Sequence, residues 1–299
     1  MVIQAPAAPR ALAPGGRFIR QIPPTPLVPV TLEKAWRRGD IREGDTVVEA
    51  SSGSTSIALA LACAQMGLKF VAFIPSSATN ERGLMIRAYG GEARRVEGGM
   101  PAVLAAAAEA ALRHDWFAAR QFENPDNAEA HRMFTGPEIL AQMECGCVDA
   151  VVSGVGTGGT LRGLWEAFDD AGCGARAYAA IPREGRAFGG NAECCSLAFS
   201  KEVPGVAECL SALYKEWKDG PRGGAVEEIP AGEELCLELT RRLWAMGYPV
   251  GPSSGLNYAV ALEAKRRLGP QARVVTVFPD RMERYFSHRV FEDLRDCRE

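Results

Sequence analysis

Residues 148–168 read VDAVVSGVGTGGTLRGLWEAF, an apolar run followed by a glycine-rich loop and an amphipathic run. The apolar run predicts a buried strand, and the segment from residue 160 onward predicts a helix. The loop at 154–160 therefore offers backbone N–H groups at the start of a helix, where the helix dipole also favours negative charge. This pattern predicts an anion site. The loop differs from a nucleotide-binding P-loop because no lysine follows it.

The same alternation of strand and helix signals extends over the rest of the chain. Strands are predicted at 45–50, 69–75, 92–98, 149–154, 176–182 and 272–279. Helices are predicted at 55–67, 80–91, 100–115, 128–143, 160–172, 232–247 and 256–269, with a less regular stretch at 183–230. Such alternation predicts an α/β fold with parallel sheets covered by helices on both faces.

Composition limits the possible partners and compartments. The 299 residues are enough for two domains, and the net charge of −3 comes without a basic block. We therefore expect neither nucleic acid nor a membrane as a partner. The first 18 residues have no continuous apolar core, so neither a signal peptide nor an anchor is expected. Nine cysteines, an odd number, fit reduced thiols in a cytoplasmic protein.

The closely spaced cysteines do not predict a metal site. Cys145 and Cys147 form one close pair and Cys194 and Cys195 the other, but neither has the two-residue spacer of a zinc knuckle. The three histidines lie far apart in the sequence. We expect no metal.

Two further loops resemble the glycine-rich loop in their chemistry. SSGSTS at 51–56 and GPSSG at 251–255 each precede a predicted helix and carry small hydroxyl side chains. Right-handed crossovers place such strand-to-helix loops on one rim of the sheet, where ligands bind. Tight turns also need glycine for their geometry alone, so a purely structural role for 154–160 stays open.

Several longer motifs resemble, in the same order, those of the cysteine synthase and cystathionine β-synthase family, over about residues 40–290. They are EASSGSTSIALA, IPSSATNERGLMIRAYGGE, QFENPDNAEAHRMFTGPEI, VVSGVGTGGTLRG, GPSSGLNYAVAL and VFPDRMERYFS. Members of this family are pyridoxal-phosphate enzymes with the two-domain tryptophan synthase β fold, fold type II. The resemblance implies a smaller α/β domain at 33–140, a larger one formed by 1–32 and 141–299, and a homodimer.

The resemblance also implies which residues bind the ligand. The cofactor phosphate is expected on Gly156, Thr157, Gly158, Gly159 and Thr160. The substrate carboxylate is expected on Ser51, Ser52, Gly53, Ser54 and Thr55, assisted by Gln121. The ligand is thus a small molecule carrying a phosphate or a carboxylate.

The segment that carries the family's Schiff-base lysine, of the type NPTGSxKDR, has no counterpart here. The corresponding region reads QIPPTPLVPVTLEKAWRRGD (21–40), in which TPLVPV resembles the family's opening strand. We expect that strand to join the larger domain. The nearest lysine, Lys34, lies in a helical pattern that favours a solvent-facing position. Pyridoxal phosphate is therefore doubtful as a cofactor and, if bound, is not expected to be covalently attached.

Three further positions depart from the family pattern and are the candidate catalytic residues. Ser54 replaces the asparagine that meets the cofactor's phenolic oxygen, and Arg281 replaces the hydroxyl residue that meets the pyridine nitrogen. A cation there disfavours a protonated ring, which weakens it as an electron sink. Glu208, in PGVAEC (204–209), aligns with a family loop beside the pocket. Arg281 can instead face solvent and pair with Asp280 or Glu283.

The sequence supports three hypotheses about function. The first is a repurposed family member that acts on an amino-acid-like or phosphate-bearing molecule, in lyase- or transferase-type chemistry, without the lysine. The second is a non-catalytic protein that binds a ligand or regulates a relative. The third is an ordinary β-replacement enzyme of amino-acid metabolism, similar to cysteine synthase, whose lysine lies elsewhere in the chain.

Overall fold

Two parallel four-stranded sheets form the framework of this protein. The computed structural model describes residues 27–143, 146–184, 200, 202–206, 211–221 and 226–295. The first sheet has the order β3 (Glu92–Val96), β2 (Lys69–Pro75), β1 (Thr46–Ala50), β4 (Phe117–Ala118). The second has the order β7 (Val226–Gly232), β6 (Arg176–Arg183), β5 (Ala150–Gly154), β8 (Val274–Thr276). The predicted α/β class with parallel sheets is confirmed.

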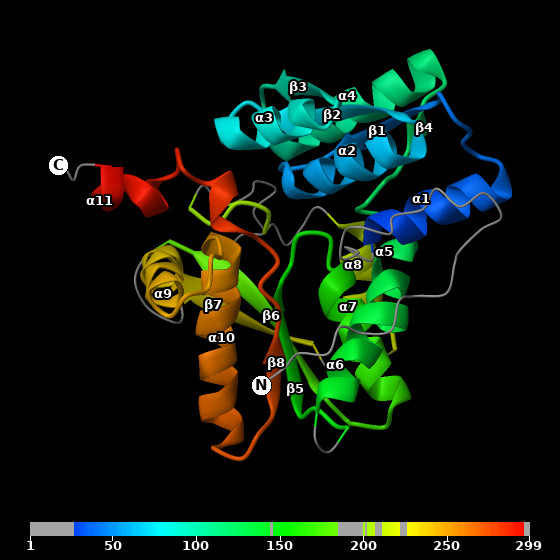
Figure 1. Cartoon of the computed structure of the whole chain (residues 1–299). Coiled ribbons are helices and arrows are strands. Elements are labelled where there is room, and N and C mark those ends of the chain that lie inside the picture. Colours follow the sequence, from blue (N-terminus) through cyan, green and yellow to red (C-terminus); the bar gives the residue numbers. More distant parts are fainter. Residues whose placement is uncertain are drawn as a thin grey trace.

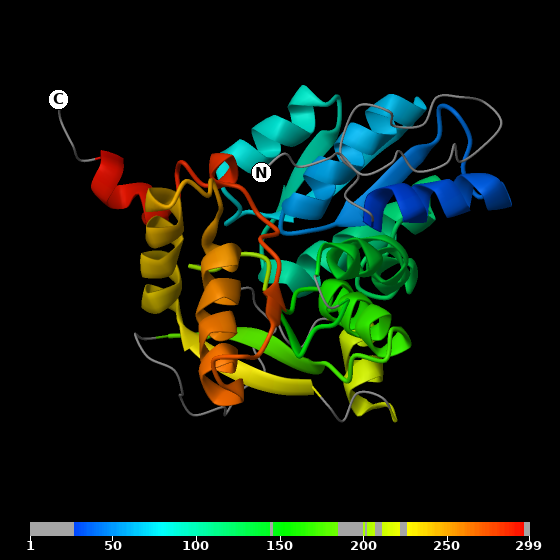
Figure 2. The same ribbon diagram turned by 60° about the horizontal axis from the view of Figure 1, so that its bottom comes forward.

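Helices cover both faces of each sheet (Figures 1 and 2). In chain order they are α1 (Leu27–Arg38), α2 (Ser54–Met66), α3 (Asn80–Ala88), α4 (Gly99–His114), α5 (Asp126–Ala130), α6 (Gly136–Gln142), α7 (Gly159–Asp170), α8 (Ala212–Asp219), α9 (Glu233–Ala245), α10 (Pro252–Leu268) and α11 (Glu292–Arg295). In Figure 1, α9 and α10 lie on one side of the second sheet, and α6 and α7 lie on the other. No helix in the described ranges is both long and apolar enough to cross a bilayer.

Neighbouring residues on the central strands pack into different cores, as the two-residue period of a strand requires. Val152 of β5 packs in a core with Val260 of α10. Its neighbour Val151 packs on the opposite face with Leu164 of α7. All four side chains are fully buried. Burying one such side chain contributes about 1.5–3 kcal/mol, so strand β5 is fixed from both faces and the loop that follows it has a rigid base.

Residues 27–30 form a helix, so the prediction of a strand over TPLVPV is wrong. Helix α1 begins at Leu27. Pro29 is compatible with the first turn of this helix. The N–H groups of a first turn have no partner within the helix, so the N–H that proline lacks is not needed there. The helix contacts α5 and α2.

The single helix predicted at 128–143 is interrupted. Helices α5 and α6 are separated by a π-helical turn, η1 (His131–Thr135). Pro137 follows this turn and has no N–H to donate to the carbonyl four residues earlier, which accounts for the change in winding. The stretch expected to be irregular, 183–230, contains helix α8 and most of strand β7.

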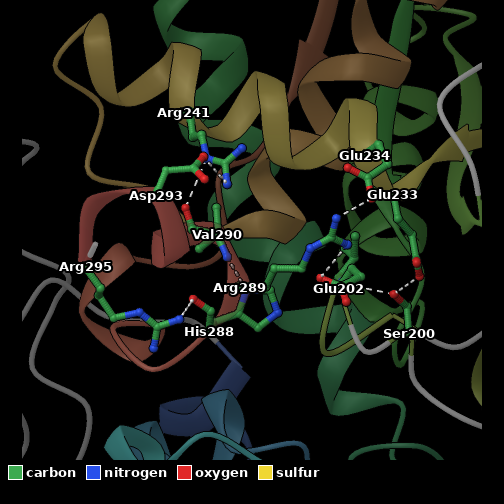
Figure 3. Close-up of polar contacts among 11 residues, drawn as sticks. Ser200, Glu202, Glu233, Glu234, Arg241, His288, Arg289, Val290, Asp293 and Arg295 are labelled. Atoms are coloured by element: carbon green, nitrogen blue, oxygen red, sulfur yellow. Dashed lines mark hydrogen bonds and ion pairs between the residues drawn. The ribbon is translucent and has the colours of Figure 1, made fainter. Parts of the chain in front are cut away.

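Near its own C-terminal end, the segment after β8 is bonded to side chains of α9 (Figure 3). Two short 3-10 turns, η3 (Met282–Arg284) and η4 (Arg289–Phe291), lead to α11. Arg241 of α9 donates to the carbonyl of Val290 at 3.1 Å and pairs with Asp293 at 3.2 Å. Arg289 pairs with Glu234 at 2.6 Å. These contacts hold the tail, residues 277–295, across the carboxyl ends of the second sheet.

Glu49, at the end of β1, gives the fold a predictable pH dependence. Its buried carboxylate accepts hydrogen bonds from the N–H groups of Ala50 at 2.8 Å and Gln121 at 3.0 Å. Burial outweighs these bonds and raises the pKa of Glu49 from 4.5 to about 8. The folded protein therefore keeps a proton that the unfolded chain loses above pH 4.5.

We predict that Glu49 stabilises the fold fully below pH 4.5 and that this contribution is lost as the pH rises to about 8. The loss in the free energy of unfolding is on the order of a few kcal/mol. Denaturant unfolding of Glu49→Gln at several pH values should show a smaller decline over this window than the unaltered protein. Parallel pH profiles of the two proteins would contradict the assignment.

Candidate active site

A cavity of about 380 Å³ lies where the carboxyl ends of the two sheets face each other. Its walls come from the loop after β1, the segment after β4, the loop after β5, residues 204–206, the start of α10 and the tail. Ligands of open parallel sheets bind at this edge because strand-to-helix loops gather there. The three loops predicted from the sequence, 51–56, 154–160 and 251–255, all contribute lining residues.

The glycine-rich loop passes so close to its neighbours that a side chain has no room. A Cβ at Gly156 would lie 2.3 Å from the carbonyl oxygen of Gly205, and one at Gly159 would lie 2.0 Å from Asn127 Oδ1. Gly158 has a φ of 77°, which side-chain-bearing residues rarely adopt. Helix α7 begins at Gly159, so N–H groups of its first turn have no partner within the helix, and Thr160 of this turn lines the cavity.

Thr157 is held so that its hydroxyl proton is available to a ligand. Its Oγ1 accepts hydrogen bonds from Asn127 Nδ2 at 2.7 Å and from the N–H of Gly159 at 3.3 Å. A hydroxyl has two acceptor lone pairs and one donor. With both acceptor positions used, the remaining O–H can donate to an anion.

His131 joins Thr160 of the same loop to Thr135. Its Nε2 lies 3.0 Å from Thr160 Oγ1, and its Nδ1 lies 3.0 Å from Thr135 Oγ1. Burial lowers the pKa of His131 to about 4, so the ring is neutral at pH 7 and carries one proton. When Thr160 donates to an anion, its oxygen accepts from Nε2–H and the hydroxyl of Thr135 donates to Nδ1. His131 thereby orients the Thr160 hydroxyl.

The roles of His131, Thr135 and Asn127 were not predicted from the sequence. The signal was present in NPDNAEAHRMFT (124–135), where His131 and Thr135 are four residues apart in a segment predicted to be helical. Residues with that spacing lie on the same face of a helix. Without the fold, nothing in the sequence showed that this face lies against the 154–160 loop.

The loop after β1 contributes small hydroxyl side chains and a second helix N-terminus to the cavity. Ser51, Ser52, Ser54, Thr55 and Gln121 all line the cavity. Helix α2 begins at Ser54, so its first N–H groups are also at the cavity edge. Ser51 does not offer a free acceptor, because its Oγ accepts from the N–H groups of Gly53 at 2.8 Å and of Ser56 at 3.4 Å.

Gly53 and Gln121 shape this loop rather than simply facing the ligand. Gly53 has a φ of 128°, and a Cβ there would lie 2.5 Å from Arg82 Cδ. The side-chain amide of Gln121 donates to the carbonyl of Ala50 at 2.6 Å. The close approach of Arg82 to Gly53 and the hydrogen bond from Gln121 to Ala50 together fix the backbone directly before α2.

Arg281, predicted at the cofactor ring, is not among the residues that line the cavity. Its guanidinium pairs with Glu283 at 2.5 Å, and its side chain is 62% exposed. The reason is local geometry, since residue 281 is extended and forms an isolated antiparallel bridge with Val250. Successive side chains of an extended segment point to opposite sides. Asp280 therefore faces inward and Arg281 outward.

Arg284 places a positive charge at the cavity, beside Ser54. It lines the cavity, and its Nη1 donates to Ser54 Oγ at 3.1 Å. Its Nε is buried without a hydrogen-bond partner, and no carboxylate pairs with it in the described part of the chain. A partly buried arginine in this situation favours an anion beside it. Glu208, the remaining candidate catalytic residue predicted from the sequence, lies outside the described residues.

No lysine is among the cavity-lining residues that the structure describes. The Nζ of Lys34 lies 2.7 Å from Asp126 and 2.5 Å from Glu129. Burial alone would lower the pKa of Lys34, but its bonds to the two carboxylates outweigh burial and raise it. An amine held protonated in this way is a poor nucleophile. The described residues also contain no group of three or more His, Cys, Asp or Glu arranged to hold a metal ion.

Comparison with known proteins identifies the class to which this site belongs. Residues 28–280 match the family model described as pyridoxal-phosphate dependent enzyme. The chain therefore belongs to that family.

Among its relatives are cysteine synthases and related enzymes. The chain is 35% identical to the cysteine synthase of Staphylococcus aureus strain Mu50 over 261 residues, which is 86% of this chain and 80% of the relative. It is 33% identical over 263 residues to the O-ureido-L-serine synthase of Streptomyces lavendulae, covering 86% of this chain and 78% of that one. These matches confirm the family resemblance read from the sequence.

Solved structures agree with this fold. The crystal structure of O-ureido-L-serine synthase superposes with a TM-score of 0.77 at 31% identity, covering 92% of this chain and 84% of that one. The O-acetylserine dependent cystathionine beta-synthase from Helicobacter pylori gives a TM-score of 0.79 at 25% identity, covering 89% of this chain and 84% of that one.

The residues present fit the phosphate of pyridoxal phosphate. The loop at 156–160 offers backbone N–H groups, close backbone approach at its glycines and the hydroxyl donors of Thr157 and Thr160. These are the groups that bind phosphate at a helix N-terminus. The fit extends to the 51–55 loop, which has the donors needed for a carboxylate.

We predict that Thr157→Val weakens binding of pyridoxal phosphate about tenfold or more, because it removes one hydrogen bond to a charged group. Titration calorimetry with the full chain measures the effect. The matched control is Thr240→Val, since the Thr240 hydroxyl bonds the carbonyl of Cys236 within α9, away from the cavity. Equal affinities of the two variants would assign the loop a structural role alone.

At the loop after β1, Arg284→Met should weaken binding of a small amino acid through its carboxylate about tenfold, because the cation beside Ser54 is lost. Arg281→Met makes the same chemical change three residues away, outside the cavity, and should leave binding unaltered. Fluorescence or calorimetric titration of both variants provides the comparison. The same loss in both, or none in either, would show that Arg284 is not a ligand-binding residue.

Proposed function

We propose that this protein binds pyridoxal phosphate in the cavity and catalyses β-replacement on an O-substituted L-serine, in the manner of cysteine synthases. One observation carries this proposal: two helix N-termini with anion-binding loops, 51–55 and 156–160, face the same cavity. That arrangement suits a phosphate at one loop and an amino-acid carboxylate at the other. The relatives named cysteine synthase and O-ureido-L-serine synthase support this class of substrate.

Different residues would bind and orient the cofactor phosphate and the substrate carboxylate. Gly156 to Thr160 would hold the phosphate, with Asn127 and His131 fixing the two threonine hydroxyls. Ser51 to Thr55 would hold the substrate carboxylate, and Arg284 would add positive charge at Ser54. The cofactor, when bound, supplies a ring that stabilises negative charge at the substrate's α-carbon.

A second candidate is a protein that holds pyridoxal phosphate, or a related phosphate-bearing or amino-acid-like ligand, without a covalent bond. It is favoured by a specific observation. Residues 1–33 contain no lysine, Lys34 is paired with two carboxylates, and no described lining residue is a lysine. In this case both binding loops operate, but no lysine amine accepts the substrate proton. No comparable observation favours a purely regulatory protein.

Two related expectations also remain proposals. We propose that residues 33–140 and the remainder of the chain act as two domains, which fits the assignment of one sheet to each part. We further propose that the chain works as a homodimer, as the family resemblance implies. Light scattering at micromolar concentration tests the second point, and a monomer would contradict it.

Borohydride reduction of the protein with pyridoxal phosphate, followed by peptide mapping, distinguishes the two candidates. The β-replacement proposal predicts a pyridoxyl group fixed to a lysine, together with cysteine formation from O-acetyl-L-serine and sulfide above background. The second candidate predicts tight binding of pyridoxal phosphate, no labelled lysine and no cysteine above background. If pyridoxal phosphate binds no better than pyridoxal, both candidates are wrong, because the phosphate loop then makes no contribution.

A further inference from the structure

We propose that Cys147 and Cys173 form a reversible disulfide, making them an oxidation site separate from the cavity. Cys147 precedes strand β5, and Cys173 lies between helix α7 and strand β6. The cavity is at the opposite, carboxyl end of these strands. The proposal therefore does not depend on what the cavity binds.

The sheet register places the two cysteines next to each other. Strands β5 and β6 are parallel neighbours in which Ala150 pairs with Arg176. Each cysteine lies three residues before its member of this pair. The carbonyl of Asp149 accepts from the N–H of Arg176 at 3.0 Å, so the pairing continues toward the cysteines. Neighbouring strands lie about 4.8 Å apart, within the Cα separation of about 4.4–6.8 Å that a disulfide spans.

The contacts of the Cys173 thiol support this placement. Its Sγ lies 3.8 Å from the carbonyl oxygen of Gly146 and is hydrogen-bonded to the backbone of Val148. It also forms a hydrogen bond with the thiol of Cys147, which lies between those two residues in the chain. Both cysteines are half-buried, so a small oxidant can reach them.

The flanking backbone can adjust to the geometry of a disulfide. Gly146, Gly172 and Gly174 border the two cysteines and have φ values of 63°, 71° and 62°. A Cβ at any of the three would have no neighbour within 4 Å. These turns are therefore not tightly packed, and the small movement needed to reach disulfide geometry meets little resistance.

The chemistry balances with a peroxide as the oxidant. The thiolate of one cysteine attacks a peroxide oxygen and displaces hydroxide, which leaves as water after protonation and leaves a sulfenic acid. The second thiol then attacks that sulfur, forms the S–S bond and releases a second water. Two thiols lose two electrons and two protons, and one peroxide is reduced to two waters. A dithiol reductant restores both thiols by exchange.

The disulfide would close a loop around the part of the chain that carries the phosphate site. Residues 147–173 include strand β5, the glycine-rich loop and helix α7. Such a link stabilises a fold mainly by restricting the unfolded chain. We expect a higher Tm after oxidation. Burial raises the pKa of the Cys173 thiol, so formation of the bond should accelerate as the pH rises above neutrality.

The test uses the full chain treated with hydrogen peroxide, digested without reductant and mapped by mass spectrometry. The expected result is a peptide pair joined through Cys147 and Cys173, together with a Tm increase of several degrees that dithiothreitol reverses. Cys147→Ser and Cys173→Ser should each abolish both effects. The matched control is Cys145→Ser, two positions from Cys147, which should retain both.

Two results would overturn the proposal. One is a Cys173 peptide linked to Cys145 instead of Cys147. The other is oxidation of Cys147 and Cys173 to separate sulfinic acids with no joined peptide and no reversible change in Tm. Because neither measurement involves pyridoxal phosphate or turnover, failure here leaves the proposed function unaffected.

Discussion

The buried carboxylate of Asp280 connects the two halves of the site. It accepts hydrogen bonds from the N–H groups of Ser253 and Ser254 at 3.1 Å, from Ser254 Oγ at 2.5 Å and from the hydroxyl of Tyr285 at 2.8 Å. Its position at the N-terminus of α10 matches the positive end of that helix dipole. A buried charge with this many donors is stabilised where an unpaired one would be costly.

From Asp280 the network extends to the first sheet. The hydroxyl of Tyr285 accepts from Arg82 at 2.9 Å, and Arg82 donates to the carbonyl of Ser52 at 2.6 Å. Arg82 and Tyr285 are each 1% exposed, so water does not compete for these bonds. The loop expected to hold the substrate carboxylate is thus tied through the tail to the helix that borders the opposite wall. Breaking this connection would alter the spacing between the 51–55 and 156–160 loops.

The outward position of Arg281 follows from the same constraint. Because Asp280 must face α10, the next residue of the extended segment has to point away from it. The family motif around FPDRMERYFS predicted that this segment borders the cavity, but motif alignment does not show which side chains face inward. The inward cation, Arg284, comes after the turn η3. Its place depends on the length of that turn, for which the sequence has no periodic signal.

Most of the fold was predictable because strands covered on both faces read as short apolar runs, which alternate here with amphipathic helical segments. Strands 46–50 and 150–154 each centre on a valine pair, Val47–Val48 and Val151–Val152, and both glycine-bearing loops that follow them line the cavity. Helix α1 was misjudged because TPLVPV resembles the family's opening strand, whereas packing against α5 and α2 favours a helix. The role of His131 could not be predicted, since it depends on contact between η1 and α7 across the fold.

We expect the cavity between the two sheets to bind pyridoxal phosphate with its phosphate on the 156–160 loop. A crystal structure of the full chain grown with pyridoxal phosphate tests this directly. We predict phosphate density within hydrogen-bonding distance of the Thr157 and Thr160 hydroxyls and of the first N–H groups of α7. Clear density for the cofactor with its phosphate anywhere else, or an empty loop at saturating cofactor, would contradict this prediction.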